Sequence, residues 1–251
     1  MAWDPRQYGR FHDERAQPFR DLVAMVEGRP GMRVLDLGCG TGELTRELHA
    51  TLGARETLGI DSAAEMLAKA PDAPGLRFEL ADIASFTVDA PFDLVFSNAA
   101  LQWLPDHGAL LRRMTALLAP GGQLAVQVPR NEAHPSHQAA EAVAVAMKRE
   151  LGGYVRRSPV LEPRQYATRL HALGFSRQLV RLQVYPHILA DRSQVVAWVK
   201  ASLLTDYEKR LARPDFERFL ALYRETVLPQ LVDESPFLYT YDRVFFWGAM
   251  P

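Results

Sequence analysis

Short apolar runs alternate with longer stretches of helical periodicity over the first half of the chain. The apolar runs predict strands at residues 33–37, 56–60, 76–80, 92–97 and 123–128. The fourth run is apolar at nearly every position, which is typical of a strand buried on both faces. The amphipathic stretches predict helices at residues 5–27, 43–52, 63–70 and 110–118. Strands and helices that alternate at this spacing predict an α/β fold with a doubly wound parallel sheet.

This alternation breaks after Pro129. Further helices are expected at residues 137–151, 163–173, 194–201 and 215–228, and further strands at residues 178–185 and 241–248. Thr205 and Glu208 have the spacing of a capping box, which predicts the start of a helix. We interpret residues 130–160 and 190–236 as helical cap insertions that fold over the carboxyl ends of the strands. The core comprises residues 29–129, 161–189 and 237–251, residues 1–28 form a helical lid, and residues 1–251 make one domain.

A glycine-rich turn follows the first predicted strand. The run Val34-Leu35-Asp36-Leu37-Gly38-Cys39-Gly40-Thr41-Gly42 ends an apolar strand, and Leu58-Gly59-Ile60-Asp61 ends the next one. Glycines between a strand and a helix allow backbone N–H groups to approach a ligand that side chains would keep away. An acid at the tip of the second strand is well placed to accept hydrogen bonds from ribose hydroxyls. The two segments together predict a nucleoside-containing cofactor.

The residues after this turn argue against a phosphate-bearing cofactor. A nucleoside triphosphatase would show Gly-Lys-Ser/Thr, whereas Gly42 is followed by Glu43-Leu44-Thr45. The dinucleotide spacing G-x-G-x-x-G also fails. Gly38 and Gly40 match its first two glycines, but the residue three positions after Gly40 is Glu43 and not glycine or alanine. The carboxylate of Glu43 at the helix start would repel a pyrophosphate. A cofactor without phosphate fits better.

The composition of the chain restricts the classes of binding partner and the kinds of site that are expected. The chain has 251 residues, 48% of them hydrophobic, and a formal net charge of −1, which argues against a nucleic-acid partner. The single cysteine, Cys39, excludes an internal disulfide and a Cys-based zinc site, and we expect it to pack behind the glycine turn. No apolar run approaches the ~18 residues needed to cross a bilayer, and no signal peptide is visible. We therefore expect a cytoplasmic protein with no membrane partner.

The order of these motifs resembles the class I S-adenosylmethionine-dependent methyltransferases, which have a Rossmann-like, seven-stranded, mostly parallel sheet. The resemblance implies S-adenosylmethionine as cofactor. It places the methionine part on Asp36 and on the backbone of Gly38, Gly40 and Gly42, the ribose on Asp61, and the adenine near Met66, Asp82 and Ile83. Ser62, Asn98 and Ala99 complete the implied cofactor set, and Arg15 is expected to pair with the carboxylate of the cofactor. Asn98, Gln102 and Trp103 are expected at the site of methyl transfer.

A closer resemblance is to the trans-aconitate methyltransferases. It rests on the spacing of Trp3, Pro5, Tyr8, Phe11, Arg15 and Pro18, on Asn98-Ala99-Ala100-Leu101-Gln102-Trp103-Leu104-Pro105-Asp106-His107, and on the tail Asp242-Arg243-Val244-Phe245-Phe246. The resemblance implies an O-methyltransferase that esterifies a carboxylate of a small polycarboxylic acid. It covers residues 1–130 well and the cap poorly, since Trp198 is followed by Ser202-Leu203-Leu204-Thr205 where the family carries a Leu-Arg-Pro stretch.

A carboxylate acceptor sets the expected chemistry of the substrate site. Model carboxyl pKa values are about 4, so the acceptor is ionised at pH 7 and needs no general base. It needs cationic or hydrogen-bonding anchors, and arginine suits carboxylates because its planar fork donates two parallel hydrogen bonds. The candidate substrate-binding residues are Tyr8, Arg130, His134, Arg156 and Arg157. A metal held by His134 and His137 is disfavoured, because Pro135 lies between them, and no metal is expected.

Two alternatives remain open at this point. The first is a methyltransferase that acts on another small acceptor, such as a malonyl thioester or a natural product. The second is a protein that binds S-adenosylmethionine without catalysis, although Asp36, Gly40 and Asp61 are all present. We expect a monomer or a homodimer.

Overall fold

The computed structural model describes residues 12–200 and 202–251, with side chains from Ala16 onward. The chain divides into two compact units. The larger unit contains Arg15–Pro129, Pro159–Gln183 and Arg243–Pro251. The smaller unit contains Arg130–Ser158 and Val184–Asp242, together with residues 12–14 of the described chain. The boundary between the units falls inside the two longest strands, so each unit is described by itself below.

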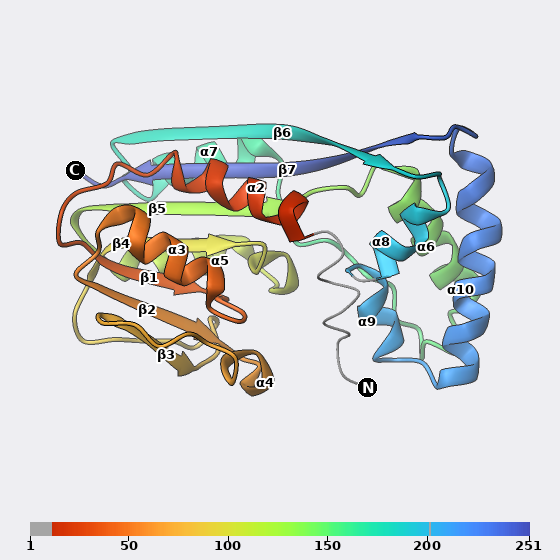
Figure 1. Cartoon of the computed structure of the whole chain (residues 1–251), viewed down its shortest axis with the longest axis horizontal. Coiled ribbons are helices and arrows are strands. Elements are labelled where there is room, and N and C mark those ends of the chain that lie inside the picture. The colour runs from red at the N-terminus through yellow and green to blue at the C-terminus, as the bar shows by residue number, and fades with distance from the viewer. Residues whose placement is uncertain (1–11, 201) are drawn as a thin grey trace. The chain divides into compact units, whose positions relative to one another are not determined.

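A single seven-stranded sheet has the order β3-β2-β1-β4-β5-β7-β6 (Figure 1). Its strands are β1 (Arg33–Leu37), β2 (Glu56–Asp61), β3 (Leu76–Leu80), β4 (Phe92–Asn98), β5 (Leu118–Pro129), β6 (Arg177–Leu189) and β7 (Phe237–Ala249). The pairs among β1 to β5 are parallel, and β7 runs antiparallel to β5. The strand order reverses on either side of β1, which places a ligand site at the carboxyl ends of β1 and β4. The predicted doubly wound, mostly parallel sheet is confirmed.

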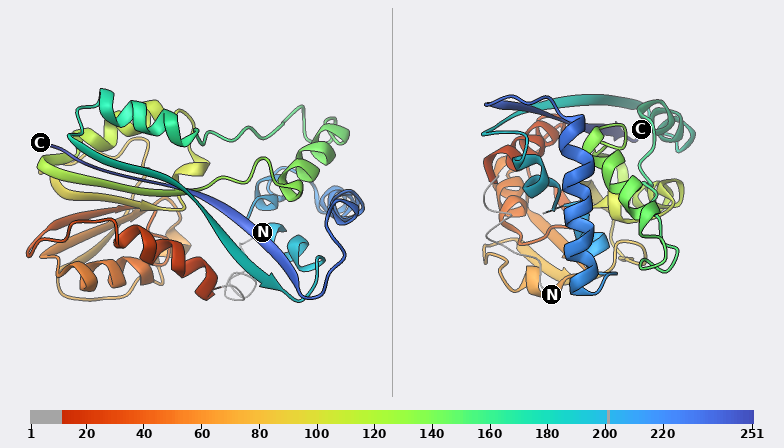
Figure 2. Two further views of the ribbon diagram at one scale, coloured as in Figure 1. Left: turned by 90° about the horizontal axis from the view of Figure 1, so that it is seen from above. Right: turned by 90° about the vertical axis from the view of Figure 1, so that its right-hand side faces the viewer.

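Helices cover both faces of the sheet in the larger unit. They are α2 (His12–Val23), α3 (Glu43–Leu52), the short α4 (Ala64–Leu67), α5 (His107–Ala116) and α7 (Pro163–Ala172), with a 3-10 turn η1 (Leu101–Trp103). Figure 2 shows α2 and α3 on one face and α5 and α7 on the other. Leu35 pairs with Leu58 and Val95 in the central strands, and all three are buried. Because helices cover both faces, β1 and β4 are buried at nearly every position, as expected for strands at the centre of a parallel sheet.

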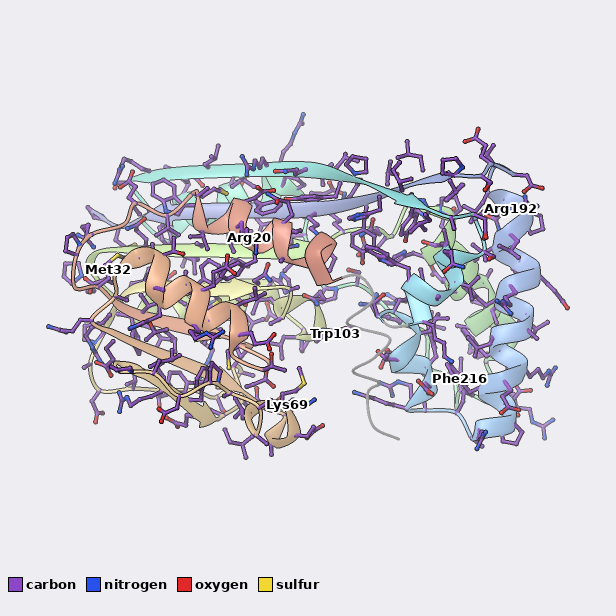
Figure 3. The ribbon with its side chains drawn as sticks, viewed as in Figure 1. Arg20, Met32, Lys69, Trp103, Arg192 and Phe216 are labelled. Atoms are coloured by element: carbon purple, nitrogen blue, oxygen red, sulfur yellow. The ribbon has the colours of Figure 1, made fainter. Side chains whose placement is uncertain are left out.

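The smaller unit has its own hydrophobic core. It contains α6 (Pro135–Ala146), α8 (Gln194–Lys200), α9 (Leu204–Glu208), α10 (Arg213–Val227) and the 3-10 turn η2 (Leu228–Gln230), together with parts of β6 and β7. Trp198 and Tyr239 pack edge to face with ring centroids 5.7 Å apart, and Phe219 stacks on Tyr207 at 4.8 Å. Arg192, labelled in Figure 3, donates to the carbonyls of Leu228 and Leu231, just after the carboxyl-terminal end of α10.

Several element boundaries differ from the sequence-based expectations. The helix expected at 5–27 ends at Val23, and its residues 5–11 lie outside the described residues. The helix expected at 63–70 is regular only over Ala64–Leu67. The helix expected at 110–118 starts three residues earlier, because the side chain of Asp106 accepts the N–H of Ala109 as an N-cap. It ends at Ala116 because Leu118 already pairs with Phe92 in the sheet.

The insertions show the same kind of difference. The helix expected at 137–151 runs from Pro135 to Ala146, because His134 is its N-cap and a proline is favourable at the first helical position. The expected capping box at Thr205 is wrong. Thr205 lies inside α9, and its hydroxyl donates to the carbonyl of Ser202 instead of capping the helix. The strand expected at 178–185 is longer and ends at Leu189. The strand expected at 241–248 is also longer and begins at Phe237.

Candidate active site

The glycine turn lies directly after β1, within the larger unit. The N–H groups of Gly38 and Cys39 both donate to the carbonyl of Ile60, at 2.8 and 3.0 Å, which ties the turn to the end of β2. Gly38 has a φ of +79°, which favours glycine, and a Cβ at this position would collide with the Cβ of Ala100. The turn therefore lies against the loop that follows β4, and no side chain other than hydrogen fits there.

Asp61 ends β2 beside this turn. Its Oδ2 accepts the N–H of Gly40 at 2.9 Å, and its Oδ1 accepts the N–H of Ala63 at 2.9 Å. Two backbone donors thus fix the orientation of the carboxylate. Each carboxylate oxygen has lone pairs for more than one hydrogen bond, so both oxygens retain capacity for a second donor. Two neighbouring hydroxyl groups, such as those of a ribose, supply such a pair of donors.

Asp36 is 4% exposed and lies behind the turn on β1. Thr45 Oγ1 donates to its Oδ2 at 2.6 Å from the first turns of α3. Burial raises the pKa of Asp36 to about 7, with the nearby charge of Asp61 acting in the same direction and the Thr45 hydrogen bond opposing it. A positive charge bound nearby favours the ionised form of this carboxyl, so the binding of a cation and the loss of the proton stabilise each other.

The remaining predicted cofactor residues follow β2 and β3. Met66 borders the turn, since its Cε would be 3.4 Å from a Cβ at Gly40. Ile83 Cδ1 would be 3.6 Å from a Cβ at Gly38. Asp82 is exposed and its Oδ1 accepts the N–H of Ala84 at 2.8 Å, while Ser62 is exposed in the turn after β2. The structure thus brings both Met66 and Ile83 to the glycine turn.

Two buried amide acceptors lie at the end of β4 and in η1. Ala99 has a φ of +54°, a strained conformation for a residue with a side chain, and its N–H donates to the carbonyl of Gln127 at 2.9 Å. Gln102 Nε2 donates to the carbonyl of Ala99 at 2.6 Å. Among residues 12–200 and 202–251, Asn98 Oδ1 and Gln102 Oε1 are buried without a hydrogen-bond partner. Trp103, labelled in Figure 3, is 49% exposed at the end of η1.

These features fit S-adenosylmethionine. Buried acceptors without partners are costly, and a ligand that brings donors compensates for them. The cofactor carries an ammonium group and two ribose hydroxyls as donors, together with a sulfonium charge. Acceptors on Asp61, Asn98 and Gln102 match the donors, and the carboxyl of Asp36 matches the charge.

Four of the predicted substrate-binding residues lie in the smaller unit. Arg130 and Arg156 are half-buried and Arg157 is exposed. His134 Nδ1 accepts the backbone N–H of Ser136 at 3.1 Å and lies 2.8 Å from Ser136 Oγ. Tyr8 lies outside the described residues, and the side chain of Arg15 is likewise not described.

Ser136 also contacts a second histidine. Its Oγ lies 3.2 Å from His137 Nδ1 and 3.2 Å from the hydroxyl of Tyr239. Burial lowers the pKa of His134, and it lowers that of His137 to about 3, with the charge of Arg156 contributing to the latter shift. Both rings are therefore neutral at pH 7. Within the described part of the chain, no group of three or more Asp, Glu, His and Cys residues is arranged to hold a metal ion.

Comparison with known proteins decides the family. A family model described as a methyltransferase domain matches residues 8–179, which is more than half of the chain. The chain belongs to this methyltransferase family. The enzyme class expected from the sequence is thereby confirmed, with S-adenosylmethionine as the cofactor of this methyltransferase. No helix in the described part of the methyltransferase is long and apolar enough to span a membrane.

Curated relatives extend the match over the full length of the methyltransferase. A trans-aconitate 2-methyltransferase of Deinococcus radiodurans is 44% identical and covers 100% of this chain and 99% of the relative. A trans-aconitate 2-methyltransferase of Rhizobium etli is 40% identical and covers 98% of both chains. The aligned region therefore includes residues 130–160 and 190–236, where the resemblance of the sequence motifs was expected to be poor.

Solved structures support the fold of the methyltransferase. The YcgJ protein of Bacillus subtilis superposes with a TM-score of 0.62 at 15% identity, covering 93% of this chain and 98% of that one. A putative methyltransferase of Bacillus halodurans gives a TM-score of 0.60 at 14% identity, covering 94% and 99%. At this level of identity, the likeness concerns the architecture alone.

The sequence did not reveal several residues that support the site. Thr45, Gln127 and Tyr166 have no local motif, because their partners are distant in the chain and become visible only in the fold. Arg243 is 6% exposed and its Nη1 donates to Gln127 Oε1 at 3.3 Å. Arg243 lies in the tail Asp242-Arg243-Val244-Phe245-Phe246, and this motif is the signal that could have identified it.

Proposed function

We propose that this methyltransferase esterifies a carboxylate of trans-aconitate or of a closely similar small polycarboxylic acid. The observation that carries the proposal is the full-length similarity, at 37–44% identity, to relatives named trans-aconitate 2-methyltransferase. The site chemistry supports it, because a carboxylate acceptor is already ionised at pH 7 and needs no base. None of the residues expected near the transfer site, Asn98, Gln102 and Trp103, is a general base.

When bound, S-adenosylmethionine supplies an electrophilic methyl group on a positively charged sulfur. The chain's own residues then have to bind the cofactor and the acceptor, orient them toward each other, and exclude water. Positioning of this kind lowers the activation barrier by up to about 7–11 kcal/mol. We assign Asp61, Met66, Asp82 and Ile83 to the nucleoside and Asp36 and the glycine turn to the methionine part. Ser62, Ala99 and Arg15 complete this proposed set. Asn98 and Gln102 present buried oxygens where the methyl group is transferred.

The proposed carboxylate anchors are Arg130, His134, Arg156 and Arg157, with Tyr8 as a further candidate. The contacts of Ser136 favour His134 in particular. Since Nδ1 of His134 accepts the N–H of Ser136, its ring proton in the neutral form is on Nε2. Ser136 therefore leaves His134 with an N–H donor for a carboxylate oxygen.

The proposal includes the organisation of the chain. We propose that both units act together as one methyltransferase domain over residues 1–251, as a monomer or homodimer in the cytoplasm, without a nucleic-acid partner. The near-zero net charge supports the last point.

An acceptor panel tests the proposed function. The enzyme is incubated with methyl-labelled S-adenosylmethionine and, separately, trans-aconitate, cis-aconitate, citrate, tricarballylate and a malonyl thioester. We expect trans-aconitate to give the highest kcat/KM. A higher value with the thioester supports the alternative acceptor class, and label transfer to none of them, with cofactor bound, contradicts the proposed substrate.

A further inference from the structure

A chain of hydrogen bonds in the larger unit connects α7 to the loop after β4. The N–H of Leu161 donates to the hydroxyl of Tyr166 at 3.2 Å, and this hydroxyl lies 2.5 Å from His107 Nδ1. The other ring nitrogen, His107 Nε2, lies 2.9 Å from the carbonyl of Leu101. His107 is 2% exposed and Tyr166 is fully buried, so water does not compete for these contacts. Neither residue is among those assigned above to the cofactor or to the substrate.

The partners of the imidazole determine its tautomer. A carbonyl oxygen can only accept, so His107 Nε2 carries the proton that binds Leu101. A neutral ring has one N–H, and Nδ1 is therefore the acceptor of the Tyr166 hydroxyl. Burial lowers the pKa of His107 from its usual range, with Arg169 acting in the same direction and with the Leu101 hydrogen bond and the charge of Asp106 opposing it. The ring is thus neutral at pH 7, and all the bonds run in one direction.

The carbonyl group that accepts the hydrogen bond from His107 belongs to the first residue of η1, the segment expected at the transfer site. Leu101 is the first residue of η1, which also contains Gln102 and Trp103. Gln102 Nε2 donates in turn to the carbonyl of Ala99, the residue with the strained backbone. A shift of η1 would therefore move the buried oxygen of Gln102.

We propose that His107 is a positioning residue for methyl transfer, which holds η1 through Leu101 and is itself held in the Nε2–H form by Tyr166. This inference rests on the methyltransferase activity but not on the identity of the acceptor. The stacking of Tyr166 on Phe246, at 4.3 Å, keeps the hydroxyl in place from the sheet side. His107 does not touch the reacting groups in this assignment, and acts on them through Leu101 and Gln102.

A purely structural role makes a different prediction. A buried histidine that only stabilises the fold would lower the amount of folded enzyme and leave the turnover and pH profile of the folded fraction unchanged. His49 offers a matched control, because its Nδ1 lies 2.8 Å from Thr57 Oγ1 near the amino-terminal start of β2, at the opposite end of the sheet. His49→Gln removes a half-buried contact between a histidine ring and a hydroxyl without reaching η1.

Kinetics of four variants test the inference, with the best acceptor of the panel and with cofactor affinity measured separately. His107→Phe, which can neither donate to Leu101 nor accept from Tyr166, should lower kcat at least about tenfold, equivalent to about 1.4 kcal/mol of barrier. His107→Gln retains an N–H near the position of Nε2 and should keep kcat within about threefold. In the wild type we expect kcat to fall at low pH as His107 is protonated, and His107→Gln should lose this acid limb of the pH profile. Tyr166→Phe frees Nδ1 for protonation and should move that limb to higher pH. His49→Gln should leave kcat and the profile unchanged.

Two results would overturn the inference. One is an identical pH profile of kcat in wild type, His107→Gln and Tyr166→Phe. The other comes from ¹⁵N–¹H NMR spectroscopy of the histidine rings in the wild-type protein. This measurement needs no methyl acceptor, and it does not depend on whether a variant folds. We expect the proton of His107 on Nε2 at pH 7, and finding it on Nδ1 contradicts the assignment even if the proposed substrate proves wrong.

Discussion

The backbone N–H of Gly40 donates to Oδ2 of Asp61 at 2.9 Å, so the glycine turn after β1 and the acid at the end of β2 form one rigid pair. The same carboxylate accepts Ala63 N–H through Oδ1. This arrangement orients both oxygens before any ligand binds, which reduces the entropic cost of binding.

Replacing Asp61 with alanine should therefore weaken S-adenosylmethionine binding strongly. The loss of hydrogen bonds to a charged acceptor, each about 1.5–3 kcal/mol, predicts an affinity at least tenfold lower. Calorimetric titration measures it, and Asp89→Ala, which removes an exposed acid of the same unit, is the control. Unchanged affinity in Asp61→Ala would remove the ribose assignment.

The contact between Gly38 and Ala100 predicts a compensating pair of substitutions. Gly38→Ala should destabilise the enzyme through the clash with the Cβ of Ala100 and through its positive φ, which alone costs about 1–2 kcal/mol. Ala100→Gly removes the clashing atom. The double variant should therefore be more stable than the sum of the two single effects, as measured by urea unfolding. Simple additivity would show that the two residues do not meet.

The raised pKa of Asp36 predicts a pH-dependent difference between the wild type and Asp36→Asn. The folded state binds this proton more tightly than the unfolded chain, so the contribution to stability is complete below the ordinary aspartate pKa. It is lost as the pH rises to about 7. Between pH 5 and pH 8, Asp36→Asn should gain about 3 kcal/mol of unfolding free energy relative to wild type. Urea unfolding at both values measures this gain, and a constant difference would contradict the pKa.

The sequence predicted the parts of the molecule that local pattern determines. The run from Val34 to Gly42 identifies a strand, a glycine turn and the ligand that approaches it, because each feature depends on neighbouring residues. Residues such as Thr45 and Tyr166 escaped prediction, since they act on partners brought close only by folding. Helix ends were missed where a single cap decides them, as Asp106 does for α5.

The contacts of Ser136 predict a selective effect on substrate affinity. Ser136→Ala leaves the backbone N–H on His134 but removes the hydroxyl near both histidines and Tyr239. It should raise KM for the carboxylate substrate several-fold with little change in cofactor affinity. An unchanged KM together with a lower cofactor affinity would speak against a substrate role of this cluster.

The two neighbouring arginines provide a matched comparison. Arg156 is half-buried and its charge affects His137, whereas Arg157 is exposed. Arg156→Met should raise KM for a polycarboxylate at least about tenfold, as expected for the loss of a charge-assisted bond, and Arg157→Met should change it less than Arg156→Met. Steady-state kinetics on both variants decides between them, and the reverse order would exchange their assigned roles.

The most direct test of the account is the chemical identity of the bond that the enzyme forms. Wild-type enzyme is incubated with trans-aconitate and S-adenosylmethionine labelled with ¹³C in its methyl group, and the product is examined by NMR and after mild alkaline treatment. We predict one labelled O-methyl ester that alkali hydrolyses to labelled methanol and trans-aconitate. A labelled product that resists alkali, or a label that stays on the cofactor, would contradict carboxylate methylation.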